Sequence, residues 1–253
     1  MGRRFGQHFL SRKSILDRIA EAACSDRVPL VVEIGPGKGA LTESLLERAD
    51  KVVAIEVDPH LVHYLHQKFH DAMEAGRLEV IEGDVLKTDF SGAVITGNLP
   101  YYITSPILEK VFALGDGWTR AVFLMQSEVA DRLAAKPGTR DYGYLSVQTQ
   151  IHARPEILFP VPRDAFRPPP KVDSAVVRLE RRSLPEVPDT STFLKFASLC
   201  FRHKRKTLRN NLAPLYEIGG WEEGRLRAEQ MSIPELAALY VKIRSFKAPP
   251  TNA

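Results

Sequence analysis

Short apolar runs alternate with stretches of helical spacing through the first half of this 253-residue chain. Each run has the length of a strand and is closed by glycine or polar residues, and the stretches between them place apolar side chains on one helix face. The predicted strands cover residues 28–34, 51–58, 78–84, 92–98 and 120–126. The predicted helices cover residues 39–49, 59–69 and 127–135, with another that Ser105 caps and Pro106 opens. This alternation predicts an α/β fold with a parallel sheet covered on both faces.

The pattern changes in the second half of the chain. Residues 145–153 alternate as a strand does, although their length and polar content also fit a helix. Residues 155–161 and 172–180 have strand patterns that could close the sheet in the antiparallel direction. Residues 181–191 carry two prolines and no periodicity, which is typical of a linker.

Beyond this linker the pattern is helical. Residues 193–201 have apolar positions at helical spacing, and Ser232 with Glu235 forms a capping box before a last helix. We therefore expect a larger α/β domain over residues 1–182 and a small all-helical domain over residues 183–253.

Charge separates the two predicted domains. Residues 1–182 hold 24 basic and 24 acidic side chains, whereas residues 183–253 hold 11 basic and 7 acidic ones, which accounts for the whole net charge of +4. A locally basic region favours a polyanionic partner. Basic surface that serves only solubility is the alternative.

Several classes of protein are disfavoured by composition. No run of 18 apolar residues occurs, so no membrane-spanning helix is expected, and the basic N-terminus lacks the apolar core of a secretory signal. Cys24 and Cys200 stand apart from any metal or redox spacing, which fits a reducing cytoplasm. No grouping of His, Cys and carboxylates predicts a metal site.

A glycine-rich turn follows the first strand in "VVEIGPGKGAL". Gly35 and Gly37 allow the backbone to approach a ligand closely. Glu56 ends the second strand, where a carboxylate accepts ribose hydroxyls, and Asp84 ends the third, where it can accept from an adenine amino group. The pattern G-x-G-x-x-A, completed by Ala40, also permits a nicotinamide dinucleotide.

The stretch "GNLPYYIT" argues against hydride transfer. The Asn98 side-chain oxygen and the Leu99 carbonyl can accept both N–H bonds of an adenine amine, which frees its lone pair. Pro100 fixes the turn, and Tyr101 can stack on the base and face the positive charge that develops on nitrogen. The alternative is a structural loop with a packed tyrosine.

Several motifs together resemble one family. The segments "FGQHFL", "EIGPGKGALT", "GNLPYYIT", "YGYLSVQTQ", "FRPPPKVDSAVVRL" and "FRHKRKTLRNNL" occur in the order seen in KsgA-type ribosomal RNA adenine dimethyltransferases. The resemblance runs from about residue 5 to about residue 240. It implies a Rossmann-like class I methyltransferase domain with a small helical domain, and S-adenosylmethionine as donor. The implied substrate is a pair of adjacent adenosines in the hairpin near the 3′ end of small-subunit rRNA, each dimethylated at N6.

The resemblance also assigns site residues. Its donor contacts fall on His8, Leu10, Gly35, Glu56, Asp84 and Asn98, beside Gly37 of the same turn. Phe166 would form a second aromatic wall opposite Tyr101, and residues 144–152 would form a helix. Two positions depart from the family pattern, His8 and Tyr102, where asparagine is usual.

The basic segment of residues 201–211 is the expected RNA contact. Its candidate residues are Arg202, Lys204, Arg205, Lys206 and Arg209. If the segment is helical, Arg202, Arg205 or Lys206, and Arg209 share one face that could follow an RNA backbone. A solvated helix face is the alternative.

The sequence is compatible with several related functions and partners. The resemblance implies an assembly precursor of the small ribosomal subunit as partner, and we expect a monomer in the cytoplasm. The competing hypotheses are an Erm-type methyltransferase of large-subunit rRNA, a DNA adenine methyltransferase, and an assembly factor that acts mainly by binding.

Overall fold

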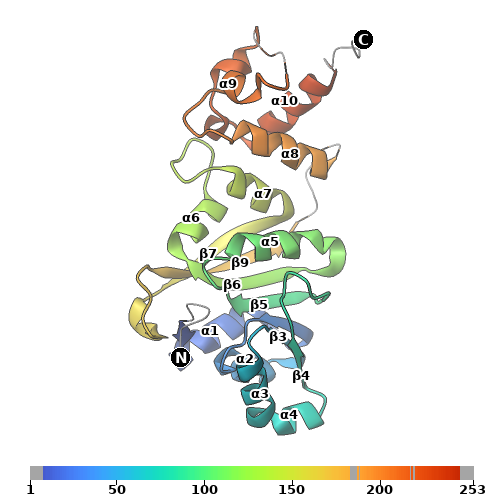
Figure 1. The fold of residues 1–253 in the computed structure, drawn as a ribbon, viewed down its shortest axis with the longest axis vertical. Coiled ribbons are helices and arrows are strands. Elements are labelled where there is room, and N and C mark those ends of the chain that lie inside the picture. Colours follow the sequence, from blue (N-terminus) through green and yellow to red (C-terminus); the bar gives the residue numbers. More distant parts are fainter. Residues whose placement is uncertain (1–7, 183–186, 188, 217, 219, 246–253) are drawn as a thin grey trace. The chain divides into compact units, whose positions relative to one another are not determined.

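The computed structural model describes residues 8–182, 187, 189–216, 218 and 220–245. Contacts divide the chain into two compact units (Figure 1). The first comprises residues 1–130 and 153–181, and the second comprises residues 131–152 and 182–253. The segment 131–152, predicted as part of the first domain, therefore packs with the helical unit.

A seven-stranded sheet forms the centre of the first unit, in the order β4-β3-β2-β5-β6-β9-β7 (Figure 1). Its strands are β2 (Val28–Ile34), β3 (Ala49–Glu56), β4 (Leu78–Glu82), β5 (Val94–Asn98), β6 (Arg120–Gln126), β7 (Ala153–Val161) and β9 (Ser174–Arg181). The first five pair in parallel, and β9 pairs antiparallel with both β6 and β7. The predicted parallel sheet and its antiparallel closure are both confirmed.

The helices of this unit include those of the predicted alternation and two that were not predicted, one before the first strand of the large sheet and one directly after the second predicted helix. They are α1 (Lys13–Ala23), α2 (Ala40–Leu46), α3 (Pro59–Lys68), α4 (His70–Glu74), α5 (Thr104–Ala113) and the start of α6 (Ser127–Ala134). The predicted cap of α5 is wrong: Thr104 already lies in the helix and its hydroxyl donates to the Pro100 carbonyl at 3.2 Å. Ser105 is therefore an interior residue of the first turn.

A two-stranded sheet joins the start of the described chain to a later segment. In it β1 (Phe9–Leu10) pairs antiparallel with β8 (Phe166–Arg167). Leu10 and Phe166 are partners in register, and both lie in the hydrophobic core of the unit. Residues 5–7 of the motif "FGQHFL" lie outside the described residues.

The second unit is helical. Besides the end of α6 it contains α7 (Tyr144–His152), α8 (Thr190–Cys200), α9 (Leu208–Leu212) and α10 (Ile233–Ser245). The helix implied for residues 144–152 is present. Its alternating appearance arises because polar residues such as Ser146 and Thr149 are buried together with Val147 and Ile151. Much of the predicted linker, residues 183–186 and 188, lies outside the described residues.

The basic segment is not one helix. Residues 201–207 form turns between α8 and α9, and Thr207 caps α9 through a hydrogen bond from the Asn210 N–H. The predicted stripe on a helix face is therefore wrong. By contrast, the predicted capping box is confirmed, because Glu235 accepts from the backbone N–H and hydroxyl of Ser232 at 2.7 Å each.

Candidate active site

The glycine turn after β2 adopts a backbone that other residues rarely take. Gly35, Gly37 and Gly39 all have positive φ. A Cβ on Gly39 would lie 2.3 Å from the Phe69 ring, so only glycine fits there. The turn is thereby held against α3 and opens to the carboxyl ends of the strands, where ligands bind in sheets of this kind.

Glu56 lies beneath this turn at the end of β3. Its Oε2 accepts from the Gly37 N–H at 3.1 Å, and its Oε1 accepts from the N–H groups of Val57 and Asp58 at 2.9 and 3.0 Å. Burial raises the pKa of Glu56, against the opposing effect of these backbone donors. A carboxylate has about four acceptor sites. Three are used here, so Oε2 retains room for roughly one ligand hydroxyl.

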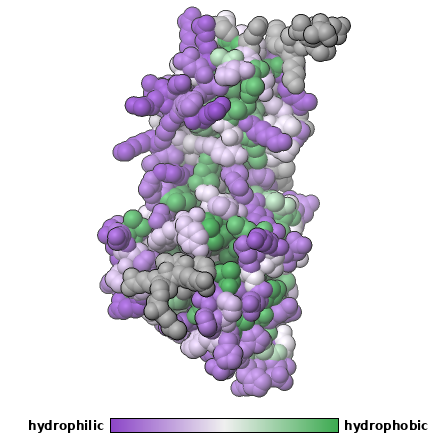
Figure 2. Space-filling view, viewed as in Figure 1, coloured by the Kyte–Doolittle hydropathy of each residue, from purple (hydrophilic) through white to green (hydrophobic). Residues whose placement is uncertain are grey.

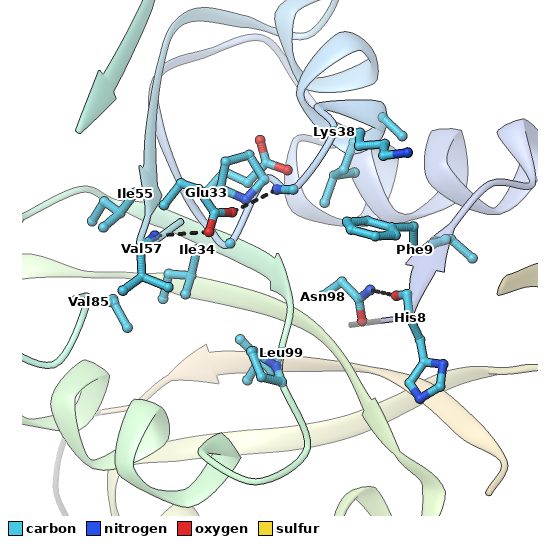
Figure 3. A pocket seen from close by; sticks show the side chains of 18 of the residues that line it. His8, Phe9, Glu33, Ile34, Lys38, Ile55, Val57, Val85, Asn98 and Leu99 are labelled. Carbon is cyan, nitrogen blue, oxygen red and sulfur yellow. Dashed lines mark hydrogen bonds between the residues drawn. The ribbon is translucent and has the colours of Figure 1, made fainter. Parts of the chain in front are cut away.

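Asp84 lies past the end of β4, on the neighbouring strand. Its Oδ1 accepts from the Leu86 N–H at 3.0 Å, which stabilises the turn that follows. Val57 and Val85, each directly after a strand-end carboxylate, line the same pocket (Figure 3). These two valines were not predicted, although an apolar residue directly after each acidic one was a visible sign of apolar pocket walls.

Asn98 ends β5 beside the same edge. Its Nδ2 donates to the His8 carbonyl at 3.0 Å, which ties β5 to the segment before β1 (Figure 3). Gly97 allows β5 to approach β2, because a Cβ there would lie 2.4 Å from the Ile34 carbonyl oxygen. The turn is then fixed by the Leu99 N–H, which donates to Leu124 at 3.0 Å. The position of the Asn98 turn therefore depends on backbone contacts with β2 on one side and with β6 on the other.

Tyr101 follows this turn and is anchored at its hydroxyl. The hydroxyl lies 2.6 Å from the Ser174 Oγ at the start of β9. Burial raises the pKa of Tyr101. The ring stacks against the His8 imidazole with 6.3 Å between centroids and 26° between planes. Tyr102, by contrast, is 64% exposed.

One pocket of about 780 Å³ brings most predicted site residues together. Its lining includes His8, Leu10, Gly35, Gly37, Glu56, Asp84, Asn98, Leu99, Pro100 and Tyr101. Phe166 does not line it. The Phe166 side chain is completely buried in the core, so the prediction that it faces Tyr101 as a second wall is not met in this structure.

The pocket also contains groups that the sequence analysis did not select. Glu33 on β2 is buried, lines the pocket (Figure 3) and accepts from the Thr42 hydroxyl at 2.6 Å. Burial raises the Glu33 pKa to about 7. The Lys38 ammonium lies 5.3 Å from the centre of the Phe9 ring, which packs over Gly37. The position of Glu33 inside an otherwise apolar predicted strand could have marked it as a buried carboxyl group.

The predicted RNA-contact residues belong to the second unit and are all exposed: Arg202, Lys204, Arg205, Lys206 and Arg209. In Figure 2 hydrophilic side chains gather over the region where Figure 1 places α9. The buried Asn211 amide donates to the carbonyls of Cys200 and His203 at 2.7 and 3.2 Å, and the Lys204 ammonium donates to the Arg140 carbonyl. Residues 202–207 therefore have a defined course without being helical, and Arg209 lies in α9.

Neither a metal cluster nor a membrane-spanning helix occurs among the described residues. They contain no group of three or more His, Cys, Asp or Glu side chains that could hold a metal ion. Over the same part of the chain, no helix is long and apolar enough to cross a membrane. Cys24 and Cys200 are buried, and burial raises the pKa of Cys24 to about 11.

The sheet order, the glycine turn and the two strand-end carboxylates define a Rossmann-like methyltransferase of class I, a class of enzymes that use S-adenosylmethionine. The family model for ribosomal RNA adenine dimethylase matches residues 1–227. This chain belongs to the ribosomal RNA adenine dimethylase family. Membership resolves the choice between a dinucleotide and a methyl donor in favour of the methyl donor.

Individual relatives agree with the family. The chain is 43% identical to the ribosomal RNA small subunit methyltransferase A of Acidobacterium capsulatum, over 94% of this chain and 89% of that protein. It is 39% identical to the protein of the same name from Chlorobium chlorochromatii, over 96% and 94%. The crystal structure of a dimethyladenosine transferase from Plasmodium falciparum superposes with a TM-score of 0.81 at 27% identity, covering 94% of this chain and 98% of that one. The 23S rRNA methyltransferase ErmE gives 0.68 at 30% identity, covering 91% and 98%.

Proposed function

We propose that this protein dimethylates N6 of two adjacent adenosines in the 3′-terminal hairpin of small-subunit rRNA, with S-adenosylmethionine as donor. The observation that carries the proposal is the shared pocket: the Asn98–Tyr101 turn and the carboxylates of Glu56 and Asp84 line the same cavity. A nucleotide-type donor and an adenine amine can thus meet at one place. The relatives named small subunit methyltransferase A support this choice of RNA.

The pocket residues fit the donor. A volume of about 780 Å³ is in the range of cofactor sites. Glu56 keeps roughly one acceptor site for a ribose hydroxyl, Asp84 can accept from the adenine amino group, and Val57 with Val85 offers apolar contact to the ring. Leu10 and the backbone of Gly35 and Gly37 would complete the site. When bound, S-adenosylmethionine supplies an electrophilic methyl group on a sulfonium.

The acceptor side uses the turn after β5. The Asn98 Nδ2 is held by the His8 carbonyl, which leaves Oδ1 to accept from the target amine. The Leu99 carbonyl is the proposed second acceptor, and Pro100 restricts the turn that carries it. Two acceptors on one amine pull its nitrogen toward a tetrahedral shape. Tyr101 then offers a π-face to the positive charge that grows on this nitrogen.

The second unit is the proposed anchor on the ribosomal particle. Exposed arginines and lysines of residues 202–209 can contact phosphates, which supply most of the affinity for nucleic acids. We propose that this segment of the predicted RNA-binding domain, residues 183–253, docks on an assembly precursor of the small subunit. We also propose that the protein is a monomer. It would work in the cytoplasm, where its rRNA substrate is assembled.

Large-subunit rRNA is the alternative substrate. The structural similarity to ErmE favours it, since both chains share the fold over nearly their full length. Identity to the relatives named for the small subunit is higher, at 43% and 39% against 30%. The small subunit is therefore the first choice.

Mass spectrometry of rRNA fragments tests the proposal. Unmethylated small and large subunits are incubated separately with S-adenosylmethionine and protein, and the rRNA is digested. We expect two methyl groups on each of two adjacent adenosines in the 3′ fragment of small-subunit rRNA. Methylation confined to the large subunit would overturn the choice of substrate, and binding to either subunit without methyl transfer would favour an assembly factor.

A further inference from the structure

Arg167 is the residue of β8 that faces the active-site pocket. It pairs in register with Phe9, and directly opposite residues of an antiparallel pair have their side chains on the same face of the sheet. The neighbouring pair, Leu10 and Phe166, points into the core, whereas Phe9 and Arg167 both line the pocket. We propose that Arg167 holds a phosphate of the RNA strand that carries the target adenosine. The inference rests on the proposed function, because it names a contact to the backbone of the acceptor strand in that reaction.

The Arg167 guanidinium is held at one nitrogen only. Its Nη1 donates to the backbone carbonyls of Asp164 and Phe166 at 3.1 and 3.0 Å. A guanidinium has five N–H groups, and the three on Nε and Nη2 have no acceptor among the described residues. The edge formed by Nε and Nη2 is one that binds a phosphate through two parallel hydrogen bonds. The backbone contacts therefore orient the side chain and leave an anion-binding edge unused.

Two neighbouring arginines are already paired with carboxylates. Arg12 lies 2.9 Å from Asp164, and Arg163 lies 2.7 Å from Asp173. Arg167 forms no ion pair with a carboxylate anywhere in the described part of the chain, although Asp164 is only three residues away. Of these three arginines, Arg167 is thus the one whose charge is available to an anion from outside, and it is also the one that lines the pocket.

The charges of the pocket wall require such a cation. Glu56 and Asp84 line the pocket where the donor is expected, and carboxylates repel an RNA strand that approaches them. The lysines that line the pocket, Lys38 and Lys68, lie beside the glycine turn, where the Lys68 ammonium donates to the Lys38 carbonyl at 3.0 Å. Arg167 is the cation that β8 contributes. It offsets the repulsion for a strand that enters along β8.

Arg167 also lies next to residues of the acceptor side. The carbonyl of Pro168, directly after it, lies 2.8 Å from the His8 Nδ1, and the His8 ring stacks on Tyr101. Arg167 itself is exposed, so its charge lies at the rim of the pocket. An adenosine that leaves its stack carries its base into an enzyme pocket, while its phosphates stay in the strand outside. A cation at this rim is therefore placed for a phosphate of that strand.

Methyl transfer to unmethylated small subunits tests the contact. Two variants of the full chain are compared with wild type: Arg167→Gln, which removes the charge, and Arg167→Lys, which keeps it. Arg154→Gln, exposed on β7 and outside the pocket lining, is the matched control. The measured quantity is the transfer ratio, which we define as the maximal single-turnover rate constant divided by the subunit concentration that gives half this rate. Arg167→Gln should lower the transfer ratio about 10- to 100-fold, the range for hydrogen bonds to a charged group, and the control should leave it unchanged.

The salt dependence of the transfer ratio distinguishes a phosphate contact from a structural role. Each lost contact to a phosphate of a single strand should lower the slope of its logarithm against log salt by about 0.7. Arg167→Gln should show this lower slope. Arg167→Lys should keep the wild-type slope and recover part of the rate, because a lysine binds phosphate as a point charge without the fork of an arginine. Loss of the two backbone hydrogen bonds alone would change the rate and not the slope.

Donor affinity tests the other anion within reach of the pocket, the carboxylate of S-adenosylmethionine. Calorimetry should give donor affinities that agree within about twofold, or roughly 0.4 kcal/mol, in all four proteins. A loss of donor affinity as large as the loss of transfer would assign Arg167 to the donor. That result overturns the inference, and so does a wild-type transfer ratio or a wild-type slope in Arg167→Gln.

These outcomes are separate from those that concern the proposed function. If the wild-type protein methylates the large subunit alone, the choice of substrate is wrong, and the same comparison on that subunit decides the role of Arg167. If it methylates neither subunit, the proposed function is overturned together with the inference that rests on it.

Discussion

The side-chain amide of Asn98 donates a hydrogen bond to the backbone carbonyl of His8 at 3.0 Å, across 90 residues of sequence. The contact fixes which end of the amide faces the pocket. Because the nitrogen is engaged, the oxygen is presented as an acceptor, which is the group that an adenine amine requires. The N-terminal segment thereby orients the residue that the proposed reaction depends on.

Asn98→Ala should therefore slow methyl transfer by about 10²–10³-fold, the usual effect of removing one preorganised polar group from a transition state. Donor affinity should fall less, and binding to subunits should survive because phosphate contacts dominate it. Single-turnover transfer of labelled methyl groups and a binding assay on the same protein measure both. The exposed Gln67→Ala on α3, away from the pocket lining and the basic segment, is the control. Near-normal transfer by Asn98→Ala would reduce the turn to a structural role.

Two substitutions of Tyr101 distinguish stacking by its ring from anchoring by its hydroxyl. Tyr101→Ala removes the ring and should cost about 1–3 kcal/mol of acceptor binding. Tyr101→Phe keeps the ring and loses only the contact to Ser174, worth on the order of 1 kcal/mol. Ser174→Ala should match Tyr101→Phe.

A double-mutant cycle checks this assignment. Tyr101→Phe combined with Ser174→Ala should cost no more than either change alone, because both remove the same hydrogen bond. Transfer rates at saturating donor supply the energies. Fully additive losses would show that the hydroxyls act separately.

Glu56 is expected to serve both the donor and the turn. Glu56→Ala should weaken binding of S-adenosylmethionine by about 1.5–3 kcal/mol, the range for a hydrogen bond to a charged group. It should also lower thermal stability, because the N–H groups of Gly37, Val57 and Asp58 lose their acceptor. Calorimetric titration and thermal unfolding measure the two effects, with subunit binding as control. Unchanged donor affinity in the folded variant would remove Glu56 from the site.

Glu33 gives the protein a pH-dependent stability. Burial raises its pKa to about 7 from 4.5, so between these values the unfolded chain is ionised while the folded one still holds the proton. The free energy of unfolding therefore falls as pH rises from about 4.5 to about 7, by on the order of 3 kcal/mol from this group. In Glu33→Gln this fall should disappear. The stability of the variant relative to wild type should then increase across that window.

Chemical denaturation at pH 5 and pH 8 measures the difference. The exposed Glu47→Gln at the end of α2 gives the reference for losing a surface carboxyl. A gap between Glu33→Gln and wild type that is the same at both pH values would mean that Glu33 is ionised in the folded protein throughout.

The sheet could be predicted from sequence because its strands are buried on both faces. Residues 28–34 and 120–126 were bounded correctly, since each is an apolar run with clear ends. The helix α7 could not be told from a strand by pattern alone. Its buried Ser146 and Thr149 stand among apolar residues, so polarity did not report which face is solvated.

The site was predictable where a carboxylate or amide side chain stands at the end of a predicted strand. Glu56, Asp84 and Asn98 each follow an apolar run, and parallel strands bring such positions to one edge. The stacking of His8 on Tyr101 was not predictable, because it depends on the pairing of β1 with β8 and has no local pattern. The same pairing turns Phe166 into the core. The spacing of basic residues over 201–211 suggested one helix face, but this prediction was wrong. Thr207 caps a new helix, α9, after a stretch of turns.

The basic segment of residues 202–209, which runs from the turns after α8 into α9, is expected to set the salt dependence of subunit binding. Its arginines and lysines are exposed, and each phosphate contact that they make should contribute about 0.7–0.9 to the slope of log affinity against log salt. Arg205→Ala with Arg209→Ala should therefore lower the slope for subunit binding by about 1.4–1.8 if both residues touch phosphates. The control removes the same charge from exposed positions of the first unit, Lys87→Ala with Arg154→Ala. Affinity is measured over a series of salt concentrations, and donor binding should be unchanged in both proteins. If the slope of log affinity against log salt is the same in the Arg205/Arg209 variant and in the control variant, these side chains do not contact phosphates and are solvated surface.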